Sequence, residues 1–264
     1  MDTPERNRID SLLAELAADR TSGAATLYRK ILNYLVLGNL ASHDLPGRIR
    51  ELAGDMVPLS YLAGRLEGVE IFDWRMVAKD LLHELRQENA AIAGKLGRVF
   101  SDGNMTLLTH SNSSTVIEVL TARRRQIGKV YQTLAVPGEE GRVSHRALGE
   151  AGLDVELIDD ARAAGVIDEG ALPVLGADCV TELFFVNKVG SADIVARAAE
   201  RGTEPVVVTG TEKLIPSEVY GDRPENPLFE RIPLDGTVIF AGDNRFRISR
   251  ERKKLENMIL KVKS

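Results

Sequence analysis

The stretch TLLTHSNSSTVIEVL, residues 106–120, decides the fold of this chain. It begins as a short apolar run, passes through five small or polar residues, and ends in apolar residues spaced as on one face of a helix. This pattern predicts a buried strand, a tight turn and a helix, which is the repeating unit of a parallel sheet. In such a sheet, ligands bind beyond the carboxyl ends of the strands, where loops meet helix N-termini.

The same alternation continues to the end of the chain. After SDGN, residues 101–104, we expect strands at MTLLTH, VYQTLAV, DVELID, LPVLGAD, PVVVTG and TVIFAG, with helical stretches between them. The preceding residues have helical period throughout, as in IDSLLAELAADR and ATLYRKILNYLVLGNL. The sequence therefore predicts an α/β protein with a helical N-terminal domain, residues 1–97, and a Rossmann-like domain, residues 98–264, whose parallel sheet has helices on both faces.

Composition and charge exclude several classes of protein. The chain has 264 residues, 44% of them hydrophobic, and a net charge of -5 at pH 7, which argues against a general nucleic-acid or anionic-membrane binder. No apolar run is long enough to span a membrane, and MDTPERNRID lacks the apolar core of a secretory signal. The single cysteine, Cys179, fits a reducing compartment, so we predict a cytoplasmic protein. The basic tail, residues 245–264, favours a solvated terminal helix over a surface for an acidic partner.

The turn in the opening stretch suits an anion. Backbone N–H groups in the first turn of a helix are unpaired, and the helix dipole makes that end positive. Ser111, Asn112, Ser113 and Ser114 add hydrogen-bond donors without bulk. Serine and asparagine are equally good helix caps, so anion binding and simple capping both remain open.

A second junction, LGADCVTELFFVNKVGSADIVARAA, residues 175–199, carries more chemistry. Asp178 ends a predicted buried strand, where a carboxylate receives a proton or holds a hydroxyl group. Asn187 and Lys188 fall at the start of a predicted helix, where a lysine reinforces an anion site. A loop cap for Asp178 and a solvated charge for Lys188 are the alternatives. We expect Lys188 to contribute charge rather than core packing, so that its removal leaves the fold intact.

Four segments resemble a known superfamily: LLTHSNSSTVIEVL, GADCVTE, NKVGSADIVARAAERGTEPVVVTGTEKL and DRTSGAATLYRKIL. They are similar to the superfamily that contains the alpha, beta and delta subunits of translation initiation factor 2B. Its enzymes are the ribose-1,5-bisphosphate and methylthioribose-1-phosphate isomerases. The resemblance implies the same two-domain architecture and a homodimer or larger homo-oligomer. It also implies a small phosphorylated ligand and no cofactor. Independently of the resemblance, no pair of histidines has metal-ligand spacing, so we expect no metal site.

The resemblance also implies roles for individual residues. The catalytic cysteine of the isomerases falls at Ser111, and their catalytic aspartate falls at Asp178. The remaining implied residues, which contact the phosphate or line the pocket, are Arg20, Ser22, Gly23, Asn112, Ser113, Ser114, Asn187, Lys188 and Lys213.

Several departures from the superfamily pattern concern the chemistry. The thiol is absent at Ser111, and His110 should point to the opposite face of its strand, so no activating base adjoins the serine. Apolar Leu134 and Val136 replace polar ligand contacts in TLAVPGEEGR, where Arg142 is the only nearby candidate to reach in. In ELFFV, residues 182–186, a glycine turn is lost, and its two phenylalanines would fill space used by a sugar.

Two hypotheses of different classes follow. In the first, the protein binds a sugar phosphate or nucleotide at its two helix starts without isomerising it. In the second, it is an aldose-ketose isomerase for a phosphorylated sugar, with Asp178 as acid/base group and Ser111 as hydrogen-bond donor. Loss of the thiol, the polar contacts and the glycine turn favours the first, and enzyme activity stays open.

Overall fold

The structure is a computed structural model that describes residues 11–16, 18, 24–38, 44–54, 56–100, 103–221 and 226–263. The chain divides into two compact units, Met1–Gln87 and Glu88–Ser264. The boundary between them falls inside the long helix α5, Trp74–Leu96. No helix in the described part of the chain is long and apolar enough to cross a membrane.

The first unit is helical, as the apolar periodicity predicts. Residues 11–16 are helical, and the helices that follow are α2 (Ala24–Val36), α3 (Leu45–Ala53), α4 (Val57–Leu66), η1 (Ile71–Asp73) and the start of α5. Pro46 and Pro58 lie in the first turns of α3 and α4, where a missing backbone N–H costs no hydrogen bond. The apolar faces meet in one core, which includes Tyr28, Ile31 and Leu62.

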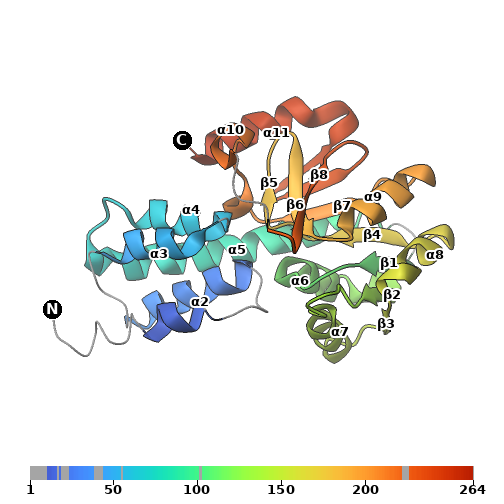
Figure 1. Cartoon of the computed structure of the whole chain (residues 1–264), viewed down its shortest axis with the longest axis horizontal. Coiled ribbons are helices and arrows are strands. Elements are labelled where there is room, and N and C mark those ends of the chain that lie inside the picture. The colour runs from blue at the N-terminus through green and yellow to red at the C-terminus, as the bar shows by residue number, and fades with distance from the viewer. Residues whose placement is uncertain are drawn as a thin grey trace. The chain divides into compact units, whose positions relative to one another are not determined.

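The second unit contains a seven-stranded sheet in the order β10-β9-β7-β4-β1-β2-β3 (Figure 1). Its strands are β1 (Met105–Thr109), β2 (Ile127–Thr133), β3 (Val155–Ile158), β4 (Leu172–Leu175), β7 (Val206–Thr209), β9 (Val238–Ala241) and β10 (Asn244–Arg247). All neighbours are parallel except β9 and β10. The predicted α/β class and its mostly parallel sheet are confirmed.

Helices cover both faces of this sheet. Successive strand residues such as Leu107 and Leu108, or Val174 and Leu175, enter different apolar clusters because side chains alternate along a strand. One face packs on the end of α5, on α6 (Ser114–Ala122) and on α7 (Gly141–Glu150). The other packs on α8 (Ala163–Asp168), α9 (Ser191–Glu200) and α11 (Ile248–Lys263). Burial on both faces explains the nearly continuous apolar runs in the sequence.

A second, antiparallel sheet was not predicted from the sequence. It has the order β5-β6-β8 and consists of β5 (Cys179–Val180), β6 (Phe184–Lys188) and β8 (Phe229–Pro233). The expectation that Asn187 and Lys188 start a helix is therefore wrong. They are the last two residues of β6, and α9 begins at Ser191.

The strand order reverses between β1 and β4. From β1 the chain builds the sheet in one direction through β2 and β3, and then continues on the other side of β1 with β4 and β7. The carboxyl ends of β1 and β4 therefore flank the crevice at which open α/β sheets bind their ligands. The serine turn follows β1, and Asp178 follows β4.

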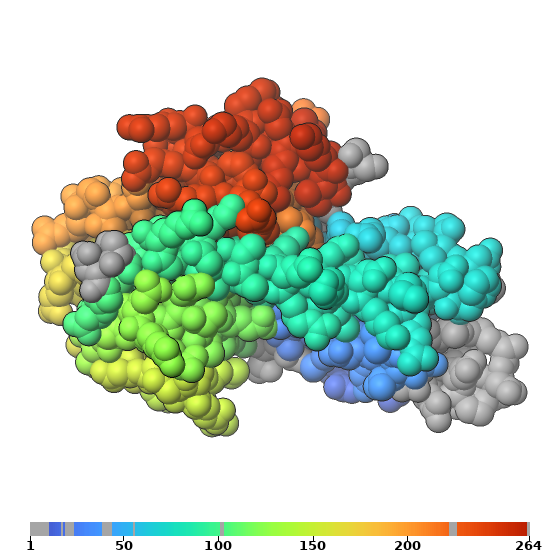
Figure 2. Space-filling model, turned by 180° about the vertical axis from the view of Figure 1, so that it is seen from behind, coloured from blue at the N-terminus to red at the C-terminus, as the bar shows by residue number. Residues whose placement is uncertain are grey.

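The basic tail forms the β10 strand and helix α11. Leu255 and Ile259 bury one face of α11 in the core, and the C-terminal residues, red in Figure 2, lie at the surface of the second unit. Several basic side chains pair with acids of this chain, as in the Arg252–Asp235 and Lys254–Glu251 ion pairs. The interpretation of the tail as a terminal helix agrees with this packing.

Candidate functional site

Connections from several strands gather at the carboxyl edge of the sheet. A Cβ placed on Gly176, after β4, would lie 2.4 Å from Ser113 Oγ, so the loop after β4 touches the serine turn after β1. The Lys213 ammonium, which follows β7, donates to the Ala177 carbonyl oxygen at 2.7 Å. The backbone N–H of Asp178 donates to the Val186 carbonyl oxygen of β6 at 2.8 Å. The second unit therefore brings its predicted site residues to one edge of the fold.

The serine turn has a special backbone at its first residue. Ser111 has φ of 65°, in the left-handed region that turns the chain sharply after β1. Its carbonyl oxygen accepts from Gln132 Nε2 and from the Ser144 hydroxyl, each at 3.1 Å. The Ser144 oxygen also lies 3.1 Å from Asn112 Oδ1. These contacts fix the turn and direct the Ser111 hydroxyl toward Glu140.

Ser113 has the capping role that the sequence left open. It is the N-cap of α6, with extended backbone, and its Oγ accepts from the Val116 backbone N–H at 3.3 Å. The neighbouring Ser114 Oγ is buried and has no hydrogen-bond partner within the described part of the chain. One serine of the turn thus completes the helix end, while the other retains an unused donor and acceptor.

This difference predicts different effects of two alanine substitutions. Ser113→Ala should lower the free energy of unfolding by about 1 kcal/mol, because the first turn of α6 loses its cap. Ser114→Ala is the matched control and should leave stability unchanged or slightly raised, since it removes a buried, unpaired hydroxyl. Urea denaturation of both variants tests this, and equal losses would contradict the assignment of Ser113 as the cap.

Glu140 and Lys188 form a buried ion pair beside Ser111. Lys188 Nζ lies 2.9 Å from Glu140 Oε1, and their side chains are only 3% and 14% exposed. The Ser111 hydroxyl donates to the same oxygen at 3.2 Å. The alternative of a solvated charge at Lys188 is wrong, and so is the expectation that the residue contributes nothing to the core, because strand β6 places it inside the fold.

Asn187 and the start of α9 are also occupied by partners within the chain. Asn187 Nδ2 donates to the Ser191 hydroxyl, which in turn donates to the Lys188 carbonyl oxygen, so this network closes the turn from β6 into α9. Glu230 Oε1 accepts from the Ala192 backbone N–H at 2.7 Å. The N-terminal end of α9 therefore already holds a carboxylate of this chain.

Four other residues singled out in the sequence are not part of the site described here. Three are not among the residues that the structure describes, and the fourth points away from the site. Arg20, Ser22 and Gly23 lie outside the described residues. Arg142 is exposed and pairs with Glu139 instead of reaching into the site.

The phenylalanines of ELFFV separate to the two faces of β6. Phe185 is buried in the core, and Phe184 packs edge-on against Tyr220 with the Arg231 guanidinium over both rings. Neither phenylalanine lines the pocket that opens beside His110. With Phe185 in the core and Phe184 half-buried against Tyr220, neither ring fills that pocket.

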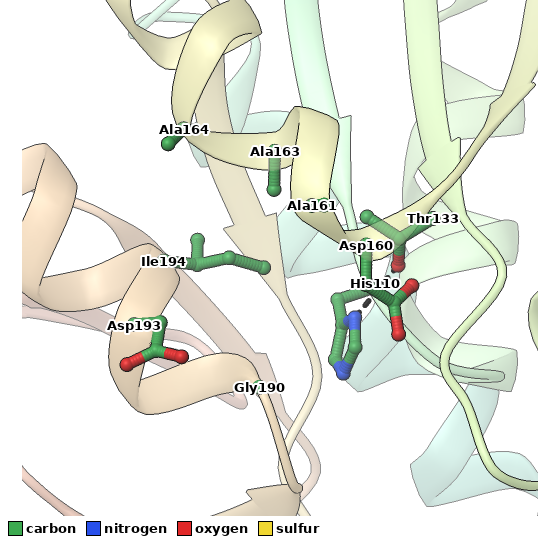
Figure 3. A pocket seen from close by; sticks show the side chains of 9 residues that line it. All are labelled: His110, Thr133, Asp160, Ala161, Ala163, Ala164, Gly190, Asp193 and Ile194. Carbon is green, nitrogen blue, oxygen red and sulfur yellow. Dashed lines mark hydrogen bonds between the residues drawn. The ribbon is translucent and has the colours of Figure 1, made fainter.

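This pocket, of about 290 Å³, opens beside His110, the residue that precedes the serine turn (Figure 3). It is lined by His110, Thr133, Asp160, Asp193 and Ile194, together with glycine and alanine residues. The lining has carboxylates but neither lysine nor arginine within the described residues. The pocket therefore suits the hydroxyl groups of a sugar better than a phosphate.

His110 is held in one tautomer in the wall of the pocket. Its Nε2 lies 2.9 Å from the Val189 carbonyl oxygen, which can only accept, so Nε2 carries the proton. Nδ1 then accepts from the Thr133 hydroxyl, 2.6 Å away (Figure 3). Burial lowers the pKa of His110 below its ordinary value, against the opposing influence of the Val189 carbonyl and of Asp160 and Glu140. A neutral ring with both nitrogens engaged cannot act as a base for Ser111.

Glu140, Asp160 and His110 are the residues that the sequence did not reveal as parts of this edge. Asp160 accepts from the backbone N–H groups of Ala135 and Val136, at 2.8 and 2.9 Å, and so shapes the loop that carries Glu140. The available signal was the segment VPGEEGR, which lies after β2 at the same sheet edge as the serine turn. In the described residues, no group of three or more His, Cys, Asp or Glu side chains is placed to hold a metal ion.

Comparison with known families assigns the chain. The model of the initiation factor 2 subunit family matches residues 50–224, which is more than half of the chain. The chain belongs to this family. The initiation factor 2B resemblance based on the serine turn, GAD and NKVG motifs is thereby confirmed.

Relatives within the initiation factor 2 subunit family include proteins of two kinds. A putative translation initiation factor eIF-2B subunit 2-like protein of Pyrococcus horikoshii is 29% identical, over 88% of this chain and 87% of the relative. A ribose 1,5-bisphosphate isomerase of Methanocaldococcus jannaschii is 33% identical over 55% of this chain and 47% of the enzyme. Family membership alone therefore leaves catalysis undecided.

Solved structures agree with the family assignment. The crystal structure of a Pyrococcus horikoshii OT3 translation initiation factor eIF-2B has a TM-score of 0.73 and 25% identity, covering 88% of this chain and 94% of that one. A tetrameric eIF2B-beta2-delta2 complex from C. thermophilum matches with a TM-score of 0.72 and 16% identity, covering 98% and 95% of the two chains. The second likeness shows the fold.

Proposed function

We propose that this member of the initiation factor 2 subunit family binds a phosphorylated sugar or a nucleotide without isomerising it. One observation carries the proposal: the Ser111 hydroxyl donates to Glu140, whose carboxylate is paired with buried Lys188. Ser111 stands where the resemblance to the isomerases places their catalytic cysteine. The position holds a polar network in place of a reactive thiol.

The chemistry of this network disfavours proton transfer. Isomerising an aldose phosphate requires a group that releases and takes back a proton, and a thiol, with an ordinary pKa of about 8.5, does so far more readily than a serine hydroxyl. A carboxylate is far too weak a base to draw a proton from a serine hydroxyl, so the Glu140 contact does not activate Ser111. His110 has both ring nitrogens engaged elsewhere. Cys179 is buried in β5 and does not replace the missing thiol at the serine turn.

The surroundings support ligand binding. The network lies at the edge where β1 and β4 diverge, next to the pocket whose Asp160 and Asp193 carboxylates suit sugar hydroxyl groups. Lys188 and Lys213 supply the positive charge that a phosphate requires. Each ammonium group has three hydrogens to donate, and within the described residues Lys188 pairs with Glu140 while Lys213 donates to the Ala177 carbonyl oxygen. We also propose that this chain forms a homodimer or a larger homo-oligomer.

A ligand screen with a product assay tests this function. Thermal unfolding is measured with ribose-1,5-bisphosphate, methylthioribose-1-phosphate, other sugar phosphates and nucleoside monophosphates. A ligand at one hundred times its dissociation constant should add about 2.7 kcal/mol of stability, visible as a raised melting temperature. The stabilising compound should then be recovered unchanged after incubation with the protein.

Ser111→Cys provides the matched variant, because it changes only oxygen to sulfur at the decisive position. It should bind the same ligand and show more isomerisation than the native protein if the remaining acid/base groups are in place. Conversion by the native protein would favour the alternative, an isomerase in which Asp178 is the acid/base group. The absence of any shift with every phosphorylated compound would refute ligand binding at this edge.

A further inference from the structure

The Lys188 ammonium, one of the two cations proposed to hold a phosphate, is already paired with an anion of its own chain. Its nitrogen lies 2.9 Å from Glu140 Oε1, and both side chains are largely buried. Ser111 adds a hydroxyl donor to the same carboxylate oxygen. A cation and a hydroxyl that converge on one oxygen are the donors that a phosphate oxygen would also use.

The loop before Glu140 has a fixed backbone. Asp160 holds the backbone N–H groups of Ala135 and Val136, and the N–H of Gly141 donates to the Leu134 carbonyl oxygen at 3.1 Å. Glu140 itself precedes the first residue of α7. Its carboxylate can therefore leave Lys188 by side-chain rotation while the backbone stays in place.

The space around the pair is kept free by a glycine. A Cβ on Gly138 would lie 2.4 Å from Glu140 Oε2 and 3.4 Å from Lys188 Nζ. Because residue 138 has no side chain, the carboxylate has room beside the ammonium. Glu139, the neighbour of Glu140, is instead exposed and pairs with Arg142. The two adjacent glutamates thus have different environments, and only one reaches Lys188.

We propose that Glu140 is an internal competitor that occupies Lys188 in the ligand-free protein and exchanges with the phosphate of an incoming ligand. The exchange sets the selectivity of the site, because a phosphate dianion offers more charge and more acceptor oxygens than the carboxylate that it displaces. This inference rests on the proposed function for the identity of the natural ligand. The exchange itself can be tested with inorganic phosphate alone.

Glu140→Gln tests the proposal, since it keeps the size of the side chain and removes its charge. Phosphate affinity is measured by calorimetric titration of the full chain. Loss of a charged hydrogen-bond partner at Lys188 should raise phosphate affinity about ten- to a hundredfold over the native protein. Glu139→Gln is the matched control and should leave the affinity unchanged. Lys188→Met combined with Glu140→Gln should abolish the gain.

A second readout covers an effect on folding. The Glu140→Ala variant should melt at a lower temperature than the native protein. Added phosphate should raise the melting temperature of the variant by more than it raises that of the native protein, and so narrow the difference. Equal phosphate affinity in the native and Glu140→Gln proteins would overturn the exchange, and so would an equal gain in Glu139→Gln.

The outcomes separate this inference from the proposed function. In one outcome, the native protein binds no sugar phosphate or nucleotide, but the Glu140→Gln variant binds phosphate more tightly than the native protein does. This result supports the exchange and refutes the proposed function. In the other outcome, the native protein binds a sugar phosphate, but the Glu140→Gln variant shows no gain in phosphate affinity. This result supports the proposed function and overturns the exchange.

Discussion

Lys188→Met should lower the free energy of unfolding by about 3–5 kcal/mol, because it leaves the buried Glu140 carboxylate without its counter-charge. Methionine retains most of the length of the lysine side chain, so the loss reports on charge more than on a cavity. The Lys188 and Glu140 side chains are 3% and 14% exposed, which limits how far water can replace the missing ammonium. Urea denaturation of the native and variant proteins measures the difference.

Two further variants show whether the loss comes from this pair. Lys188→Met with Glu140→Gln removes both charges and should recover most of the stability, because replacing a whole buried ion pair is far less costly than breaking it. Lys253→Met removes a lysine that is 77% exposed and paired with Glu256, and should change stability by less than about 0.5 kcal/mol. A double variant as unstable as the sum of its single changes would show that the two side chains are not coupled.

Gly141→Ala is the other substitution with a large expected effect, a loss of about 3 kcal/mol. A Cβ at residue 141 would lie 1.9 Å from the Thr133 carbonyl oxygen and 2.9 Å from that of Leu134. Both are backbone atoms at the end of β2, so α7 and the loop carrying Glu140 have to move. Glycine is thus required here by the close approach of α7 to the sheet.

Gly149→Ala in the same helix is the control with the opposite sign. Nothing lies within 4 Å of a Cβ at residue 149, so alanine should raise the free energy of unfolding by roughly 0.5–1 kcal/mol through its better helix propensity. Urea denaturation of both variants decides the matter. Destabilisation of similar size at residues 141 and 149 would mean that the close contact with Thr133 is not what constrains this helix.

The sequence predicted the main sheet because its signals are local. TLLTH and PVVVTG are apolar, rich in β-branched residues and bounded by polar turns, and they form β1 and β7. The sheet β5-β6-β8 was not predicted from the sequence because it depends on pairing between distant segments. Cys179 and Val180 make a two-residue strand, and β6 pairs with residues 229–233, which follow only after α9, β7 and α10 (Ser217–Tyr220). The spacing of apolar residues along one segment does not indicate which distant segment it pairs with.

The candidate site was predicted in outline but not in its electrostatics. The serine turn and Asp178 were placed correctly beyond strand ends, because parallel strands present their carboxyl ends at one edge. Glu140 was missed since its partners, Ser111 and Lys188, are distant in sequence and meet only through the fold. An ion pair of this kind depends on burial and on side-chain direction, neither of which VPGEEGR reveals.

The most direct test of the account is the phosphorus NMR spectrum of ribose-1,5-bisphosphate incubated with a stoichiometric amount of the native protein. The spectrum reports binding through the widths and positions of the two phosphate signals, and conversion through new signals from the ketose. We predict signals perturbed by binding and no ketose, because the Ser111 hydroxyl lacks the acidity of a thiol and the neighbouring His110 has both ring nitrogens engaged. Ketose signals in the native sample would contradict this account of the serine turn.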